Sequence, residues 1–436
     1  MVAPVKTGRC LLLAATMLGA SRSAAGQSSQ PVQNSAAGGL SLTQSGVPPQ
    51  PQPAPHAEPP QYPLTGDWGG YRSTLHDRGI DFAGSILLDT SRNLTGGFTQ
   101  DKTVFRYLLD MSATLDTEKL FGWHGGTLFI DFQNHDGKNG SGDLTRDVQG
   151  FDNIDGSHFT QLYQFWYQQL LAGDTLRIKA GKIDANTDFS LIEHGKEFIN
   201  SSPSYSLTIF PMVTYPDPAP GAQMFWSPAG TWYLAAGGFY SNQHQTFLNF
   251  AGHPEAIERA AGGAFLIGEA GARWSLSGSL NYPGHAALGA WGHTGEFPKF
   301  QGGHAEGTGG FYAFADQSVY QQALPGGTNR DVGLFLQYGA SDPSVSQMAQ
   351  HIGGGITATG LLPGRPVDIT GLAASWVRLG DLIGTRYGDE TAVELFYRLQ
   401  LTNWFNFKPD LQYIRHPGGL PVQDALVFTL RAEVDF

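Results

Sequence analysis

The sequence is poor in cysteine and in positive charge. Its 436 residues include a single cysteine, Cys10, and 26 lysines and arginines against 38 acids, for a formal charge of −12. Because Cys10 falls in the leader expected at residues 1–25, the mature chain has no disulfide, no thiol nucleophile and no thiolate metal ligand. That leader holds three cations and no acid, so its removal lowers the charge from −12 to −15. Such a balance argues against nucleic acid as a partner, because nucleic-acid binding calls for a basic surface.

Long apolar runs are also missing. The longest lies in the leader, where 11 residues from Cys10 to Ala20 follow Lys6 and Arg9 and precede the small residues 23–25. A spanning helix needs about 20 apolar residues, so residues 1–25 are expected to be a signal peptide. Residues 26–63 are rich in Pro, Gln and Ser and are expected to be a disordered linker. If the chain lies in a membrane, it must do so as a closed barrel.

Motifs for known catalytic chemistry are absent. The sequence has no G-x-S-x-G elbow, no H-E-x-x-H pair and no Walker loop, and its 13 histidines show no metal-ligand spacing. We therefore expect no enzyme activity, no cofactor and no metal site. A barrel-embedded hydrolase with dispersed Ser/His or paired acids is left open as a rival, as is a soluble, secreted sugar-binding β-protein.

What the sequence does contain is strict alternation, seen best in residues 425–436. Leu426, Phe428 and Leu430 share one parity, whereas Thr429 and Arg431 take the other. Side chains alternate between the two faces of a strand, so this segment has one apolar and one largely polar face. The pattern is typical of an outer-membrane strand with lipid outside and water inside.

The same alternation recurs throughout residues 64–436, between turns rich in Gly, Pro, Asn and Asp. With roughly 22–24 residues per strand and connection, this region predicts an all-β, transmembrane antiparallel barrel of about 16 strands, with fourteen or eighteen as alternatives. A short N-terminal helix is expected between Asp67, as its cap, and Gly79, as its left-handed end. Tyr163, Phe165 and Tyr167 are assigned to the lipid face. The 58 glycines and 12% aromatics suit turns and girdles.

Several segments, in order along the chain, resemble the carbohydrate-selective porin family (OprB type) of Gram-negative outer membranes. They are residues 64–72 (LTGDWGGYR), 119–126 (KLFGWHGG), 165–169 (FWYQQ), 181–186 (GKIDAN), 360–368 (GLLPGRPVD), 409–414 (PDLQYI) and 416–419 (HPGG). The resemblance implies a barrel of about sixteen strands in the cell outer membrane that lets sugars diffuse inward. It does not cover the linker at 26–63, and Gln168 stands where a glutamate is more usual.

We therefore expect passive, sugar-selective diffusion of monosaccharides such as glucose, with a general diffusion porin for small polar solutes as the alternative. The expected partners are sugars in transit, outer-membrane lipid and lipopolysaccharide, and the barrel is expected to be a monomer or a homotrimer.

Selecting a sugar calls for aromatic faces and for paired donors and acceptors on the pore wall, held weakly enough for release. The inward parity predicts this set: Arg106, Asp110, Asp131, Gln164, Trp166, Gln168, Arg177, Lys179, Glu394, Arg398, Arg431 and Glu433. We expect Arg106 to lie with Asp110, Arg177 with Lys179, Glu394 with Arg398, and Arg431 with Glu433. Mixed charges on this wall would discourage ions of either sign. Alternatively, the charged side chains of this wall only pair with one another and keep the lumen hydrated, without selecting a solute.

Trp166 is expected to stack on sugars, so that Trp166→Ala would weaken sugar discrimination while the pore stays open. A register slip of one residue would instead place it in the aromatic girdle. The stretch at 188–220 alternates poorly, and long ordered loops are often functional. It is expected either to fold into the pore and narrow it, or to cap the barrel mouth from outside.

Overall fold

The computed structural model describes residues 63–241, 262–276, 282–323, 329–382 and 384–436. The expected signal peptide and, apart from Pro63, the expected linker lie outside these residues. No helix in the described part of the chain is both long and apolar enough to cross a membrane.

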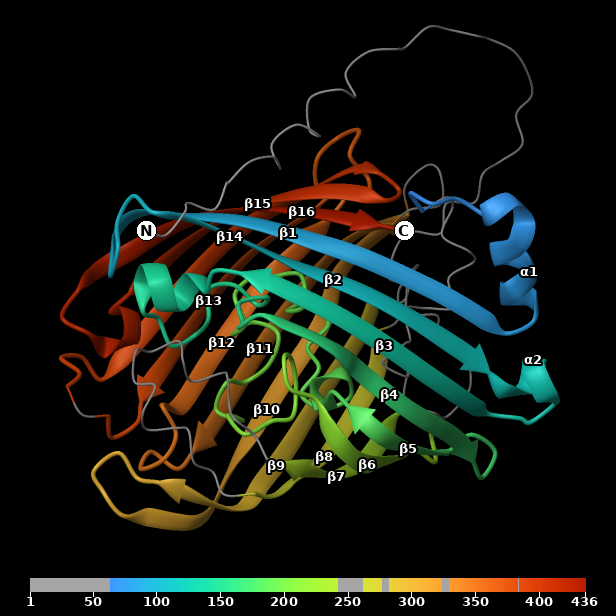
Figure 1. Cartoon of the computed structure of the whole chain (residues 1–436), viewed down its shortest axis with the longest axis horizontal. Helices are drawn as coiled ribbons and strands as arrows, with labels where there is room; N and C mark the ends of the chain where they lie inside the picture. Colours follow the sequence, from blue (N-terminus) through green and yellow to red (C-terminus); the bar gives the residue numbers. More distant parts are fainter. Residues whose placement is uncertain (1–62, 242–261, 277–281, 324–328, 383) are drawn as a thin grey trace, which may run out of the picture.

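Sixteen antiparallel strands form one closed barrel, which confirms the predicted fold (Figure 1). The strands are β1 Ile80–Gly97, β2 Thr103–Asp116, β3 Gly126–Gly137, β4 Phe159–Leu171, β5 Leu176–Ile183, β6 Ala219–Trp226, β7 Trp232–Ser241, β8 Gly263–Leu276, β9 Tyr282–Pro298, β10 His304–Ala323, β11 Asn329–Ser341, β12 Met348–Thr359, β13 Ile369–Leu379, β14 Asp389–Thr402, β15 Phe405–Arg415 and β16 Gln423–Asp435. Each strand pairs with its neighbours in sequence, and β1 pairs with β16 to close the sheet.

The alternation in β16 has the predicted orientation. Phe428 and Leu430 are 38% and 39% exposed on the outer surface, whereas Thr429 and Arg431 are buried inside the barrel. The same holds in β14, where Leu395 is exposed and Glu394 is buried. An apolar outer band of this kind faces lipid in an outer-membrane barrel.

One predicted orientation is wrong. Tyr163 was assigned to the lipid face, yet it is buried within the barrel, and its hydroxyl donates a hydrogen bond to Asp184. The cause is a shift in register between β3 and β4: Asp131 pairs with Gln164, but the next residue, Phe132, pairs with Leu162. A bulge leaves one residue unpaired and re-aims its side chain, so the parity of β4 changes at Tyr163.

The two ends of the barrel differ. At one end lie α1 (Tyr71–Asp77) and α2 (Thr117–Phe121) (Figure 1). Asp67 accepts a hydrogen bond from the backbone N–H of Ser73, and Gly79 has a φ of +88°, so both expected helix-end residues contribute at the ends of α1. At the opposite end, two long connections, 138–158 and 184–218, turn back into the barrel. They include η2 (Ser141–Thr145) and η3 (Ala185–Thr187).

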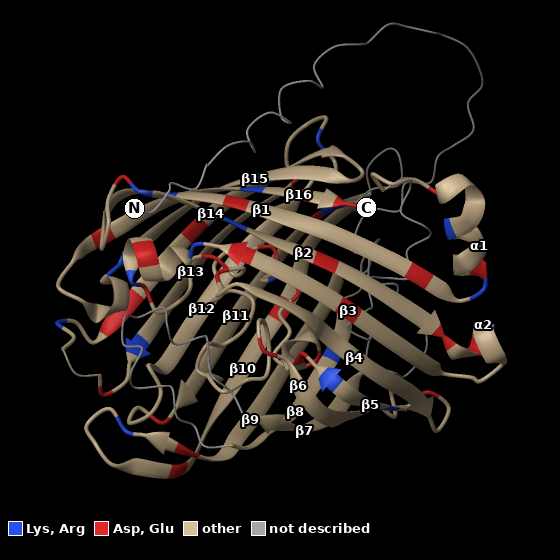
Figure 2. Ribbon diagram, in the orientation of Figure 1, with Lys and Arg blue, Asp and Glu red and all other residues tan. Residues whose placement is uncertain are grey.

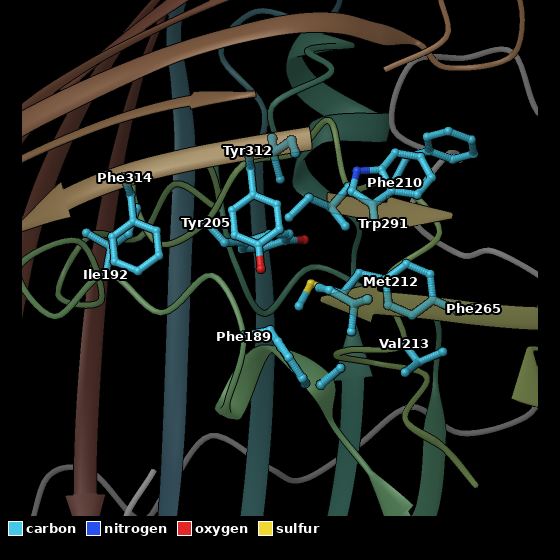
Figure 3. Packing of buried hydrophobic residues seen from close by; sticks show 14 of the residues in the cluster. Phe189, Ile192, Tyr205, Phe210, Met212, Val213, Phe265, Trp291, Tyr312 and Phe314 are labelled. Atoms are coloured by element: carbon cyan, nitrogen blue, oxygen red, sulfur yellow. The ribbon is translucent and has the colours of Figure 1, made fainter. Parts of the chain in front are cut away.

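Loop 184–218 packs on an apolar part of the inner wall. Its buried side chains include Phe189, Ile192, Phe198, Phe210, Met212 and Val213, and the strands supply Phe225, Tyr233, Phe265, Trp291, Tyr312, Phe335 and Phe396. Figure 3 shows loop and wall side chains pointing toward one another. Phe210 meets Trp291 edge-on at 5.6 Å, and Phe198 meets Phe396 at 4.9 Å between ring centroids. Burying each such side chain stabilises the loop by roughly 1.5–3 kcal/mol.

Candidate functional site

Loop 138–158 is held by charged side chains of the wall. Arg106 of β2 forms ion pairs with Asp152 at 2.5 Å and with Asp155 at 2.7 Å. Arg431 of β16 pairs with Asp89 at 2.6 Å and with Asp152 at 3.3 Å. These pairs are desolvated, so each charge depends on its partner to offset the cost of leaving water.

Loop 184–218 is anchored in a similar way. Arg177 and Lys179 of β5 both contact the carboxylate of Asp188, at 2.6 and 2.5 Å. Glu394 of β14 accepts hydrogen bonds from the backbone N–H groups of Ile199 and Asn200, at 2.6 and 3.0 Å. Backbone donors that would otherwise be buried without partners are thereby satisfied by the barrel wall.

The two loops are joined to each other. The backbone N–H of Asn153 donates to the carbonyl of Ile199 at 2.8 Å, and the N–H of Ser201 donates to the carbonyl of Gly150 at 3.0 Å. Together they form one partition inside the lumen. Of the two placements expected for residues 188–220, folding into the pore is therefore confirmed.

The partition leaves a cavity of about 580 Å³ against one side of the barrel. Its wall comes from β1–β4, from β14–β16 and from both loops. The lining residues are Leu87, Leu108, Asp110, Asp131, Gln133, Asn153, Ile154, Tyr163, Gln164, Asp184, Asn186, Thr187, Lys196, Glu197, Ser201, Ser204, Tyr205, Thr214, Tyr215, Arg398, Lys408, Arg431 and Glu433. Figure 2 shows charged residues along β1–β3, with few on β10–β12.

Acids and cations come to this cavity from different strands. Asp110, Asp131 and Gln164 come from β2–β4. Arg398 and Lys408 come from β14 and β15, and both contact Glu197 of the inner loop, at 2.9 and 3.3 Å. Burial opposes ionisation of Glu197, but Lys408, Arg398 and Lys196 outweigh it and lower its pKa to about 2. Glu197 is therefore an anion at all ordinary pH values.

Three tyrosines add aromatic surface to the same cavity: Tyr163 from β4, and Tyr205 and Tyr215 from loop 184–218. A tyrosine offers an apolar ring and a polar hydroxyl, which matches a sugar with its C–H faces and hydroxyls. The rings of Tyr163 and Tyr215 lie 6.2 Å apart. The cavity thus combines aromatic faces, acceptors and donors, the combination that sugar selection requires.

The predicted site residues separate into two groups. Those that line the cavity are Asp110, Asp131, Gln164, Arg398, Arg431 and Glu433. Those that point inward but lie elsewhere are Arg106, Trp166, Gln168, Arg177, Lys179 and Glu394, all at most 4% exposed. Gln168 accepts a hydrogen bond from Arg177 at 3.3 Å, so it too supports the loop anchor.

Arg177 and Lys179 lie together on Asp188, as expected, but the other three predicted pairings along the wall are wrong. Arg106 binds loop acids and not Asp110, and Arg431 binds Asp89 and Asp152 and not Glu433. In β14, Glu394 and Arg398 both bind loop 184–218, and not each other. Inward loops bring partners from distant sequence, and strand alternation carries no information on them.

Trp166 points inward, as predicted, but both faces of its ring are occupied. Phe129 stacks on it at 4.9 Å between centroids, and the ammonium of Lys179 lies 4.3 Å from its centre. Trp166 is not among the residues that line the cavity. Its position therefore supports packing and does not offer a free surface to a sugar.

Sequence reasoning missed most of the loop residues in the lining, above all Glu197, Lys196 and Tyr205. The signal available was the poor alternation at 188–220, which marked an ordered loop without indicating which of its side chains reach the pore. Tyr163 was missed for a different reason, namely the bulge in β4.

Comparison with known proteins agrees with this geometry. A model of the carbohydrate-selective porin, OprB family matches residues 106–436. Porin B of Pseudomonas aeruginosa is 24% identical over 429 residues, covering 86% of this chain and 91% of that protein. A putative porin of Acinetobacter baylyi, QuiX, is 28% identical over 134 residues, covering 29% of this chain and 30% of its own length.

Solved structures show the same fold. The high-pH structure of Pseudomonas putida OprB matches with a TM-score of 0.75 at 23% identity, and covers 86% of this chain and 98% of that one. The low-pH structure of the same protein matches with a TM-score of 0.57 at 21% identity and the same coverage.

Proposed function

Because this chain belongs to the carbohydrate-selective porin, OprB family and forms an outer-membrane barrel, we propose that it is a passive channel for monosaccharides such as glucose. In this proposal sugars cross through the cavity between the inner loops and the wall formed by β1–β4 and β14–β16. The chain acts as a channel and not as an enzyme.

The lining of this cavity carries the proposal. A neutral sugar has many hydroxyls. When the sugar enters the cavity, each hydroxyl gives up hydrogen bonds to water and forms hydrogen bonds to the wall instead. Here acceptors such as Asp131, donors such as Arg398 and the face of Tyr205 surround one passage. Because each exchange is nearly neutral in free energy, the sugar can enter and also leave.

Liposome swelling tests the proposal. Purified protein is reconstituted, and swelling rates are compared for glucose, a disaccharide, an amino acid and a neutral polyol of matched size. We expect glucose to enter fastest. Equal rates for glucose, the amino acid and the polyol would indicate a general diffusion porin.

A variant that narrows the cavity tests whether sugars cross the barrel through it. Ser204 lines the cavity, and Ser204→Trp should slow glucose entry because the indole occupies the space that the sugar crosses. Ser157→Trp, at an exposed loop position, is the matched control and should swell like the parent. Unchanged glucose entry through a folded Ser204→Trp channel would show that sugars take another path.

A further inference from the structure

Every cation that lines the cavity already has an acidic partner. Lys196 lies 2.7 Å from Glu193, Arg398 and Lys408 lie 2.9 and 3.3 Å from Glu197, and Arg431 lies 2.6 Å from Asp89. The positive side of the passage is thus neutralised by the protein itself. An anion in transit would have to compete with these carboxylates for contact.

The opposite side has acids without cations. Asp110, Asp131 and Asp184 line the cavity, and among the described residues none of the three forms an ion pair with Lys, Arg or His. Their contacts are polar but uncharged or acidic: Gln133 donates to Asp110 at 2.7 Å, and the side chains of Asp110 and Asp131 interact directly.

Two acceptor atoms on this side lack any partner. The Oδ1 atom of Asp131 and the Oε1 atom of Gln133 are buried and accept no hydrogen bond from any described residue. The two residues are only 4% and 5% exposed, and both line the cavity. A buried acceptor without a donor is costly, so these atoms mark a place where a donor from a visiting solute would be favourable.

We propose that this acidic wall, formed by Asp110, Asp131 and Asp184, binds the ammonium group of solutes in transit, so that the channel prefers protonated amino sugars to sugar acids. The inference rests on the proposed sugar pathway and names the charge class that this pathway favours. It replaces the expectation that mixed charges discourage ions of both signs.

The chemistry of the wall fits an ammonium group well. Neighbouring carboxylates repel each other and share a proton unless a cation lies between them, and an ammonium group can take that place. It also brings three N–H donors and no acceptor, which suits a wall whose unpartnered atoms are all acceptors. A sugar carboxylate would meet repulsion here and paired cations on the other side.

Ion selectivity is the first test. In a planar bilayer with a KCl gradient, we expect a reversal potential on the cation-selective side. Asp110→Asn/Asp131→Asn should reduce the ratio of K⁺ to Cl⁻ permeability by about fivefold, because the acidic pair that attracts cations is removed from a confined passage. The control is Asp101→Asn, which removes an exposed acid at the loop between β1 and β2.

Solute entry is the second test. Liposome swelling is measured at neutral pH with glucosamine hydrochloride, glucose and sodium glucuronate. We expect glucosamine to enter faster than glucuronate through the parent channel, and the double variant to lose that difference. A parent channel that favours Cl⁻ or glucuronate would overturn the inference. Glucose entry in the same vesicles reports separately on the proposed sugar pathway.

Discussion

Charged side chains inside this barrel act mainly on loops and less on one another. The clearest examples are three wall residues whose side chains contact loop atoms: Arg106, Arg177 and Glu394. Each of them is at most 2% exposed. A buried charge needs a partner in close contact, and a loop can approach it more closely than a diagonal neighbour on a strand. Inward parity was therefore a sound guide to burial, but a poor guide to partners.

Trp166 gives a prediction at this scale. Trp166→Ala removes a ring packed between Phe129 and Lys179, and should lower the free energy of unfolding by about 3 kcal/mol. Thermal denaturation in detergent measures this loss. Glucose discrimination should be retained, since Trp166 does not line the cavity, and weakened discrimination would instead assign the ring to the pathway. Trp123→Ala, at a position 63% exposed, is the control.

At the scale of elements, loop 184–218 depends on a histidine. His194 contacts Asp316 of β10 through its Nδ1 atom and Asp331 of β11 through its Nε2 atom, the latter at 3.4 Å. Burial opposes protonation of His194, but its hydrogen bonds to both carboxylates outweigh burial and raise its pKa to about 9. Lys196, which also interacts with Asp316, adds positive charge nearby.

Loop 184–218 should therefore be held less firmly against β10 and β11 at alkaline pH, where His194 loses its proton. Because the pKa of His194 is raised by docking, its contribution is complete below about pH 6.5, declines as pH rises, and is lost above about pH 9. The full contribution is about 3 kcal/mol. Current noise of single channels should increase between pH 7 and 10, and His194→Asn should remove most of that change. A pH-independent parent would contradict the assignment, and His304→Asn, at an exposed position, is the control.

Strands were predictable from the sequence because alternation is a local property. Phe428 and Arg431 could be assigned to opposite faces without any knowledge of their neighbours. The bulge at Tyr163 could not be foreseen, since it depends on how β3 and β4 pair. The docked position of loop 184–218 was equally inaccessible, because Phe198 and Phe210 bury themselves against residues of β9, β11 and β14 that lie far away in sequence.

At the scale of the whole molecule, the inner surface is divided, and is not uniformly wet as alternation predicts. Aromatic residues such as Phe225, Phe265 and Trp291 face inward and pack against the loop, and the polar cavity is confined to the other side. A pattern of apolar residues on both faces of β8 or β9 indicates in retrospect a wall that is covered on both sides.

The closed sheet also predicts a behaviour of the intact protein. All sixteen strands are hydrogen-bonded on both edges, so no edge is available to begin unfolding in detergent. Protein kept unheated in sodium dodecyl sulfate should remain compact and migrate faster on a gel than the boiled sample. A single position for both samples would contradict a barrel of this stability.

The cavity through which we propose that sugars pass lies beside the seam where β1 meets β16, and its walls come from the first four and the last three strands and from both inner loops. During assembly this cavity therefore does not exist until the first and the last strands have paired and the sheet has closed. Permeability arrives together with closure of the ring, so a partly assembled molecule should not leak solutes across the membrane during insertion.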